Sequence, residues 1–315
     1  MTDLIIIGGG VAACSAGIFA GRRGLAPTII AKDLGGQTAS TSEIENYPGI
    51  GRIEGPELVE LFSQQARNVG CTFIEGHVSE VHENNEVFDV VTRTSRFTAS
   101  SILCAFGKTP KNLGVAGEER YEGKGIHYCN AHSALHYKDK IVAVVGGGNS
   151  ALELVWKLSG IARHIYLIHR SDQFRAEKIL LDRLKTLHNV EQRLYTTVTA
   201  LSGEEYLREI TLTPSDADKQ EIVAVDGLFV AIGFESSTSF ISGLVECDAT
   251  GKIQIDDKCQ TTKPGIFAAG DCTTVPYQQI IISAGEGAKA AISAYQYLSK
   301  KQGKRPLQVD WGFHA

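Results

Sequence analysis

A glycine turn near the start of the chain has the residue types and spacing of a phosphate-binding loop. The apolar run at residues 4–7 ends in three glycines, and a small-residue segment follows. Gly8 allows the tight turn, Gly10 lets the backbone approach a pyrophosphate, and Ala13 keeps the following helix close to its strand. The N–H groups and the dipole of that helix would hold the phosphates. The motif therefore predicts a dinucleotide site.

The same pattern occurs a second time, later in the chain. The apolar run at residues 141–145 ends in Gly146 and Gly148, and Asn149 and Ser150 open the small-residue segment that follows. A chance turn after a hydrophobic run is the alternative for one motif alone, but two copies favour nucleotide binding. Two such units in one chain imply two cofactors that face each other.

Basic residues after the second motif indicate which nicotinamide the chain uses. The strand expected at residues 164–168 is followed by His169, Arg170 and Arg175, about 20 residues beyond the glycines. An acidic residue there would accept a ribose hydroxyl, whereas guanidinium groups match a 2′-phosphate through paired, charged hydrogen bonds. The pattern favours NADPH over NADH. A solvated basic patch at a helix start is the alternative.

Composition limits the class of protein that positions these residues. A chain of 315 residues favours two domains, and 43% hydrophobic residues suffice for proper cores. A net charge of −5 argues against nucleic acid or an anionic membrane as the main partner. We expect no signal peptide and no membrane span, because the apolar runs are too short. Seven scattered cysteines indicate a cytoplasmic protein without a disulfide framework, and no metal site is expected.

Two polar segments that fit no helix or strand period carry a family resemblance. Residues 35–37 and 43–49 have the composition of surface loops. They are similar to the flavin-contacting segments of the low-molecular-weight thioredoxin reductases, a resemblance that extends to about residue 300. It implies that the chain binds FAD and that Gly36, Gln37 and Asn46 contact it.

A second FAD motif of this family is found near the end of the chain. Residues 266–271 resemble the segment in which a strand ends beside the flavin at Gly270 and Asp271 hydrogen-bonds the ribityl chain; a solvated carboxylate is the alternative. The residues that follow resemble the flavoprotein component of alkyl hydroperoxide reductase. Gln279 and Ile280 are expected at the start of a helix whose N-terminus faces the flavin and stabilises negative charge on it.

The resemblance assigns further flavin contacts to Val78, Ala105 and Gly107. One position departs from the usual pattern. A dinucleotide fold normally has an acidic residue for the ribose about 20 residues after its glycines, and this position is not acidic here. Either Asp33, one turn further on, takes its place, or Lys32 and the backbone hold that end of the ligand.

The resemblance also implies the layout of the chain. We expect an α/β protein with two Rossmann-like, three-layer dinucleotide-binding domains. The FAD domain would be discontinuous, built from residues 1–113 and 245–315, and the NAD(P)H domain at residues 114–244 would be inserted within it. The family further implies a homodimer.

The redox motif of the family is altered in this chain. Thioredoxin reductases pass electrons through a Cys-x-x-Cys pair followed by an aspartate; this chain has Cys129, but His132 and Ser133 replace the second cysteine and the acid. A dithiol cannot cycle with one sulfur, so ordinary thioredoxin reduction is not expected. His132 is either a proton donor or a polar loop residue. Three other cysteines are expected to be small buried residues: Cys14, Cys104 and Cys272.

The C-terminal segment contains aromatic residues beyond the last expected helix. Ordinary thioredoxin reductases end soon after that helix, whereas in thioredoxin-reductase-like ferredoxin–NADP reductases an extension places an aromatic ring on the flavin. We hypothesise that Trp311, Phe313 or His314 covers the flavin here. A simple tail and a dimer strap are the alternatives.

The sequence thus predicts an FAD enzyme that NADPH reduces and that has lost the family's dithiol. Its electron acceptor would be ferredoxin or flavodoxin, a quinone, oxygen or a second bound flavin. Three alternatives stay open. In the first, Cys129 would pair with a distant thiol or with a substrate thiol. In the second, electrons would flow in reverse, which is compatible with the weaker phosphate signal of Ser171 in place of the family's second arginine. In the third, the protein would be a flavin-binding sensor without turnover.

Overall fold

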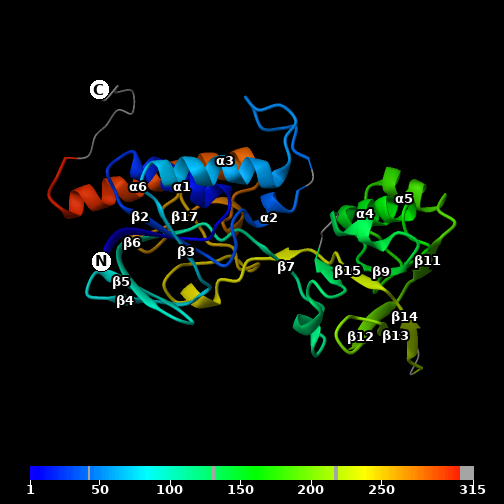
Figure 1. Ribbon diagram of the computed structural model, residues 1–315. Coiled ribbons are helices and arrows are strands. Elements are labelled where there is room, and N and C mark those ends of the chain that lie inside the picture. Colours follow the sequence, from blue (N-terminus) through cyan, green and yellow to red (C-terminus); the bar gives the residue numbers. More distant parts are fainter. Residues whose placement is uncertain (42, 129–131, 216–218, 306–315) are drawn as a thin grey trace. The chain divides into compact units, whose positions relative to one another are not determined.

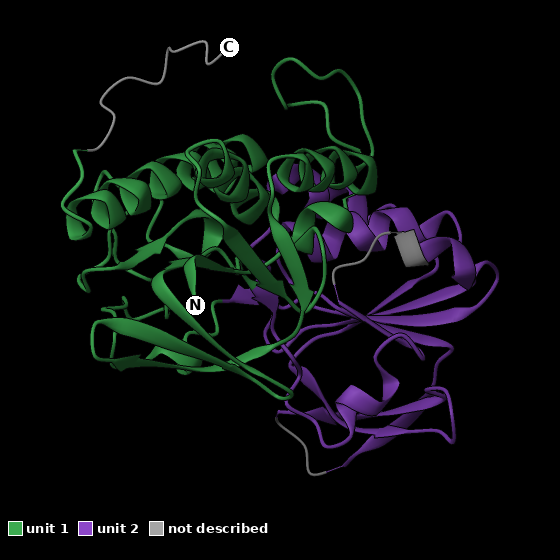
Figure 2. Cartoon of the chain, turned by 60° about the vertical axis from the view of Figure 1, so that its left-hand side comes forward, with its two compact units in different colours: residues 1–108, 236–315 green, residues 109–235 purple. Residues whose placement is uncertain are grey.

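The chain forms two compact units (Figures 1 and 2). Unit 1 contains residues 1–108 together with residues 236–315, and unit 2 contains residues 109–235. None of the helices that the structure describes combines the length and the apolar composition needed to cross a membrane. The structure is a computed structural model, and it describes residues 1–41, 43–128, 132–215 and 219–305.

Unit 1 is built on a parallel sheet whose central strand is β1 (Thr2–Ile7). It pairs with β2 (Pro27–Ala31) on one side and with β6 (Arg96–Cys104) on the other. Beyond β2 the sheet continues with β3 (Thr72–Glu75), and β17 (Ile266–Ala268) pairs in parallel with β6. The strand order therefore reverses at β1, which is where ligands bind in open α/β sheets.

Helices cover one face of this sheet and a β-meander covers the other. The helices α1 (Val11–Gly21), α3 (Gly55–Asn68) and α6 (Ile280–Lys301) lie together over one face (Figure 1). On the other side, β5 (Val87–Thr92) pairs antiparallel with both β4 (Val78–Asn84) and β6. Short helices complete the unit: α2 (Gly36–Ala39), η3 (Ser239–Ile241) and η4 (Gly270–Cys272).

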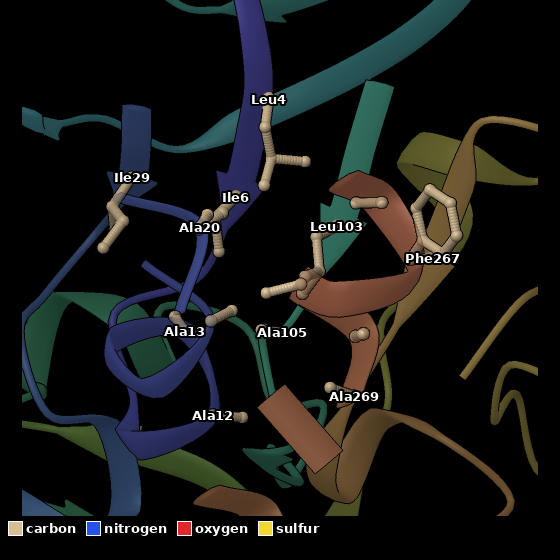
Figure 3. Close-up of a cluster of buried hydrophobic side chains, with 14 of the residues drawn as sticks. Leu4, Ile6, Ala12, Ala13, Ala20, Ile29, Leu103, Ala105, Phe267 and Ala269 are labelled. Atoms are coloured by element: carbon tan, nitrogen blue, oxygen red, sulfur yellow. The ribbon is translucent and has the colours of Figure 1, made fainter. Parts of the chain in front are cut away.

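The alternation of side chains along β1 explains these layers. Leu4 and Ile6 point into the core beneath the helices, and Ile5 and Ile7 point into the core on the opposite face. Full burial of such a side chain contributes about 1.5–3 kcal/mol. Figure 3 shows the helix-side core, where α1 contributes small side chains that allow the helices to lie close to the strands.

Unit 2 repeats the same plan. Its sheet is fully parallel, in the order β11-β10-β9-β15-β8. Its five strands are β8 (Ile126–Tyr128), β9 (Ile141–Val145), β10 (His164–Ile168), β11 (Val190–Arg193) and β15 (Gly227–Val230). Helices pack on one face: α4 (Asn149–Ser159) and α5 (Lys178–Leu184). An antiparallel sheet packs on the other: β12 (Thr196–Ser202), β13 (Glu209–Pro214) and β14 (Glu221–Ala224). Two short helices precede β9: η1 (Glu118–Tyr121) and η2 (His132–Tyr137).

The predicted fold class is confirmed. Val142 and Val144 of β9 face the helices of unit 2, while Ala143 and Val145 face its antiparallel sheet. Each unit therefore has a helix layer, a parallel sheet and an antiparallel layer, as expected for two Rossmann-like domains.

The boundaries between the two units lie a few residues from the predicted domain boundaries. We expected the inserted segment to span residues 114–244, and the compact unit spans residues 109–235. A two-stranded ribbon explains the difference. Its strands β7 (Thr109–Pro110) and β16 (Phe234–Glu235) pair antiparallel with each other, which joins both ends of the inserted segment within unit 2.

Candidate functional site

The first glycine turn lies between the carboxyl end of β1 and the N-terminus of α1. Gly8 has a φ of +117°, and its N–H donates to the carbonyl oxygen of Ile30 at 2.9 Å. A Cβ on Gly8 would lie 2.4 Å from the carbonyl oxygen of Ala105. On Gly10, by contrast, a Cβ would come no closer than 4.0 Å to its nearest neighbour, the carbonyl oxygen of Gly35. Gly8 is therefore required by the fold, and Gly10 keeps a space open.

The N-terminus of α1 faces this space. No side chain caps the helix at Gly10, and its first turn contains no acidic residue. The N–H of Cys14 makes the first bond within the helix, to the carbonyl oxygen of Gly10, so the N–H groups before it have no partner inside the helix. Gly36 borders the same space, because a Cβ there would lie 4.0 Å from Cα of Gly10. These groups fit a pyrophosphate.

The second glycine turn repeats this geometry in unit 2. The N–H of Gly146, with a φ of +150°, donates to the carbonyl oxygen of Ile168 at 3.0 Å. A Cβ on Gly146 would lie 2.3 Å from the carbonyl oxygen of Ala231, whereas a Cβ on Gly148 would meet nothing within 4 Å. Again no side chain caps the helix, here α4, and no acidic residue lies in its first turn.

Several residues assigned to the flavin lie together in unit 1 although they are distant in sequence. The amide of Asn46 donates to Oε1 of Gln279 at 3.0 Å. Gln279 is the residue before α6, and Ile280 begins that helix, as predicted. Ile280 packs against the apolar cluster of the segment around Ile44. Gln37 lies in the one-turn helix α2, where the composition is that of a loop, and its side-chain amide donates to the carbonyl oxygen of Lys108 at 3.2 Å.

Asp271 lies in η4, directly after β17, where its carboxylate is half-buried. The hydroxyl of Ser283 donates to Oδ1 of Asp271 at 3.3 Å. Burial raises the pKa of Asp271, while the Ser283 hydrogen bond and the positive charges of Lys108 and Lys252 act in the opposite direction. A hydroxyl-rich ligand chain could replace the hydrogen bonds with water that this carboxylate loses.

We expect that replacing Asp271 with asparagine stabilises the flavin-free protein at neutral pH. Because burial raises the pKa of Asp271, its charged form destabilises the folded state. This cost is present above the raised pKa, shrinks as the pH falls through it, and is absent once the carboxyl is protonated in both states. Urea unfolding of both proteins at several pH values measures the difference in the free energy of unfolding.

The control variant is Ser283→Ala, which removes a hydrogen bond to the charged carboxylate. It should destabilise the protein at neutral pH and have less effect in acid. An advantage of Asp271→Asn that grows as the pH falls would contradict the prediction.

Sequence reasoning missed two polar residues on the buried face of α6. Besides Ser283, the buried carboxylate of Glu286 accepts a hydrogen bond from the N–H of Gly270 at 2.9 Å. Gly270 has a φ of +78°, and Glu286 holds the turn that positions Asp271. The helical spacing of Ser283 and Glu286, three residues apart among alanines and glycines, was the available signal.

The remaining flavin-assigned residues lie in different surroundings. The side chain of Val78 is buried in the core, so only its backbone is available to a ligand. Ala105 is buried beside the first glycine turn, and its N–H donates to the carbonyl oxygen of Ile7 at 2.8 Å. Gly107 has a φ of +63° with open space at its Cβ position. Lys32 is exposed.

In unit 2, the segment after β10 wraps around the second glycine turn. The ring of His169 stacks on Phe174 with centroids 5.1 Å apart, and a Cβ on Gly147 would overlap the His169 ring. The N–H of Arg175 donates to the carbonyl oxygen of Gly147 at 2.7 Å. Arg170 and Arg175 are exposed, and neither guanidinium forms an ion pair within the part of the chain that the structure describes.

Asn149 and Ser171 have structural partners at the same place. The amide of Asn149 donates to Glu177 at 3.0 Å, and its oxygen accepts from the N–H of Glu177 at 2.8 Å. The hydroxyl of Ser171 lies 3.3 Å from Nε2 of His169. Ser150 is exposed in the first turn of α4. The predicted nucleotide residues of unit 2 therefore surround one helix N-terminus.

The side chains predicted for the redox segment and for the C-terminal tail lie outside what the structure describes. Cys129, Trp311, Phe313 and His314 lie outside the described residues, and His132 is described only as the first residue of η2. Cys14, Cys104 and Cys272 are buried, as predicted. Burial raises the pKa of five thiols: Cys14 and Cys272 to about 12, Cys71 and Cys259 to about 11, and Cys104 well above its ordinary value. These thiols stay protonated and unreactive at neutral pH.

Comparison with known sequences gives matches over most of the chain. Residues 2–293 match the family model described as pyridine nucleotide-disulphide oxidoreductase. The chain is 35% identical over 311 residues to the F protein of the alkyl hydroperoxide reductase of Escherichia coli (strain K12) and 32% identical over 297 residues to an NADH dehydrogenase of Bacillus subtilis (strain 168). Each match covers 94% of this chain and 58% of the relative, so the chain spans little more than half the length of these curated relatives.

Solved structures match over all or nearly all of their own length. The thioredoxin reductase of Lactococcus lactis in its FR conformation has a TM-score of 0.78 and 28% identity, covering 95% of this chain and 100% of that chain. The thioredoxin reductase of T. acidophilum has a TM-score of 0.75 and 30% identity, covering 96% of this chain and 99% of that chain.

Proposed function

Because this chain belongs to the pyridine nucleotide-disulphide oxidoreductase family, we propose that it is an FAD-dependent oxidoreductase that receives its electrons from NADPH. The predicted resemblance to thioredoxin reductases is confirmed. Members of that group bind FAD and use NAD(P)H. The observation that carries the proposal is the same turn geometry in both units, each of which leaves a helix N-terminus and one glycine free for a pyrophosphate.

The residues of unit 1 fit FAD. The open space at Gly10 and Gly36 and the N–H groups of α1 would hold the pyrophosphate. Asp271 would accept from the ribityl hydroxyls, and the joined pair of Asn46 and Gln279 would offer amide groups to the ring. When bound, FAD accepts a hydride from a nicotinamide and passes the electrons on.

The N-terminal turn of α6 provides a positive electrostatic potential that would stabilise negative charge on the reduced flavin. The helix begins at Ile280 with no side-chain cap and no acidic residue in its first turn, so its N–H groups stay free. The positive end of the helix dipole stabilises negative charge placed before it. This contribution is typically about 0.3–1 kcal/mol, and larger in partly buried positions.

We propose that the electron acceptor is something other than thioredoxin reduced through the usual dithiol. Only one cysteine, Cys129, stands in the redox segment, with His132 in place of the second. Of the six described cysteines, five are buried with raised thiol pKa values, so these five offer Cys129 no ready partner, and Cys247 alone among the six is partly exposed. The alkyl hydroperoxide reductase F protein and NADH dehydrogenase among the relatives support a different acceptor. A small redox protein such as ferredoxin or flavodoxin is the leading candidate, and the enzyme would act as a homodimer.

An anaerobic titration with NADPH and, separately, with NADH tests this function. The flavin absorbance is followed while the electrons taken up by each protomer are counted. Bleaching by NADPH with one electron pair per protomer is the expected result, since it shows one flavin and no hidden disulfide. A second electron pair would reinstate a disulfide at Cys129 or a second flavin. Failure of both nucleotides to bleach the flavin would overturn the proposal and favour reversed electron flow or a sensor.

We expect Arg170→Gln and Arg175→Gln each to raise the KM for NADPH about tenfold, because each loses one charge-assisted hydrogen bond worth about 1.5–3 kcal/mol. The KM for NADH should stay unchanged, since NADH has no 2′-phosphate. Steady-state kinetics with both nucleotides measure this. The control is Arg163→Gln, at an exposed residue just before the amino end of β10. Equal changes with both nucleotides would contradict the assignment.

A further inference from the structure

A cavity of about 350 Å³ lies in unit 2 at the amino-terminal ends of the sheet strands, whereas the second glycine turn lies at their carboxyl ends. Its wall includes Lys140 and Asp226, which immediately precede β9 and β15, and Gly125, which precedes β8. The glycine turn follows the other end of β9, and a strand of this length separates the two by about 16 Å. Since nucleotides bind at the carboxyl ends of such strands, this cavity is not part of the nucleotide site.

Two neutral hydrogen-bonding groups form the floor of the cavity. Nε2 of His127 lies 2.7 Å from the hydroxyl of Tyr137. Burial, and secondarily the charge of His136, lowers the pKa of His127, and burial raises the pKa of Tyr137. Both side chains are therefore uncharged at neutral pH, and the His127 ring also stacks on Phe229 with centroids 5.1 Å apart. These two side chains can donate or accept hydrogen bonds.

The charged groups on the wall are mainly positive. Within the described residues, the ammonium of Lys140 forms no ion pair and lies 5.4 Å from the ring centre of Tyr137. One guanidinium nitrogen of Arg208 is 4.0 Å from Oδ1 of Asp226, at the outer limit of an ion pair. The other oxygen of Asp226 already accepts from the N–H of Ile141 at 2.9 Å. Among the described side chains, the cavity is thus lined by one unpaired cation, one weakly paired cation and one carboxylate that already accepts a hydrogen bond.

Two glycines give this wall its shape. A Cβ on Gly227 would lie 2.3 Å from the Tyr137 ring, so the ring occupies the place of a side chain. Gly125 has a φ of +117°, and a Cβ there would lie 2.7 Å from Cβ of Leu207, the residue before Arg208. Because both positions lack a side chain, Tyr137 and the segment carrying Arg208 approach the strand ends closely. The cavity therefore depends on specific residues in three separate segments.

We propose that this cavity binds a small organic anion, a carboxylic acid or a phosphate ester. Lys140 and Arg208 would pair with its charge, while His127 and Tyr137 would hydrogen-bond its neutral oxygens. The volume lies near the lower end of the range of small-molecule pockets, about 300–1,000 Å³, and exceeds the needs of a bare ion. The cavity shares no lining residue with either proposed cofactor site, so the proposal does not depend on the proposed electron acceptor.

Isothermal titration calorimetry of the flavin-loaded protein with inorganic phosphate and with malonate tests the site. Arg208→Gln and Lys140→Gln should each weaken binding about tenfold, as expected for loss of one charged partner. Asp226→Asn should strengthen binding about threefold or more, because it removes a repelling charge and keeps an acceptor for the N–H of Ile141. Both altered cations are exposed, so their loss should leave the fold intact.

The control is Arg93→Gln, which removes an exposed cation from unit 1, in the turn between β5 and β6. It should bind both probes as the unaltered protein does. Binding of phosphate alone would identify a phosphate ester as the ligand class, and binding of malonate alone a carboxylic acid. Unchanged binding of both probes by Arg208→Gln and by Lys140→Gln would overturn the proposal, as would no binding of either probe to the unaltered protein.

Discussion

Replacing Gly10 with alanine is expected to yield a folded protein that retains almost no flavin. The backbone of Gly10 is extended, with a φ of −79°, and its Cβ position is open, so alanine fits without strain. The added methyl group would occupy the space before the N–H groups of α1. Loss of two charged hydrogen bonds to a pyrophosphate costs about 3 kcal/mol or more, which lowers FAD affinity at least about a hundredfold. Flavin fluorescence after gel filtration measures retention, and circular dichroism measures folding.

Gly8→Ala is the matched control, because it makes the same chemical change two residues earlier. Its φ of +117° disfavours alanine, and the new Cβ would lie 2.4 Å from the Ala105 carbonyl oxygen, which belongs to the backbone of a buried strand end. This variant should lose several kcal/mol of stability and fold poorly even without flavin. If Gly10→Ala lost its fold as Gly8→Ala does, the open space would have no ligand-specific role.

Replacing Gly287 with alanine is expected to destabilise unit 1 by about 3 kcal/mol or more. A Cβ on Gly287 would lie 2.1 Å from the carbonyl oxygen of Ala12, and that oxygen belongs to the backbone of α1. Relief of the overlap requires α1 and α6 to separate, which also disturbs the buried hydrogen bond at 2.6 Å from the Ser15 hydroxyl to the carbonyl oxygen of Ala284. Urea unfolding followed by circular dichroism measures the change.

Gly285→Ala should have the opposite effect. Gly285 lies in the same helix, is exposed, and has no atom within 4 Å of its Cβ position. Alanine there improves helix propensity, so the variant should gain about 0.5–1 kcal/mol. A loss of stability in both variants, or in neither, would show that contact between α1 and α6 does not decide the effect.

The sequence was informative where backbone geometry demands one residue type. Gly8 and Gly146 follow apolar strands and must adopt positive φ beside a neighbouring strand end, and no other residue does this without strain. The start of α6 at Ile280 was predicted through the family resemblance. The three-layer plan followed from the same source, and the alternating burial along β1 provides its physical basis.

Other features depend on contacts between distant segments, which no local pattern encodes. The bond between Asn46 and Gln279 joins two loops that become neighbours only after folding. The segment at Gly36 has the composition of a loop and forms a short helix, since a single helical turn and a loop have nearly the same sequence preferences. Tyr137 and Arg208 were not singled out, because the cavity that they line exists only once three segments meet.

The discontinuous order of unit 1 has a consequence for how the protein is made. A ribosome completes residues 109–235 before it has synthesised β17 and α6, so unit 2 has its whole sequence available first. Until those last elements emerge, the β17 side of β6 lacks its partner strand and α1 lacks the helix that covers it. The nascent chain therefore exposes an unpaired strand edge and an apolar helix face during this interval, when aggregation and chaperone binding compete with folding.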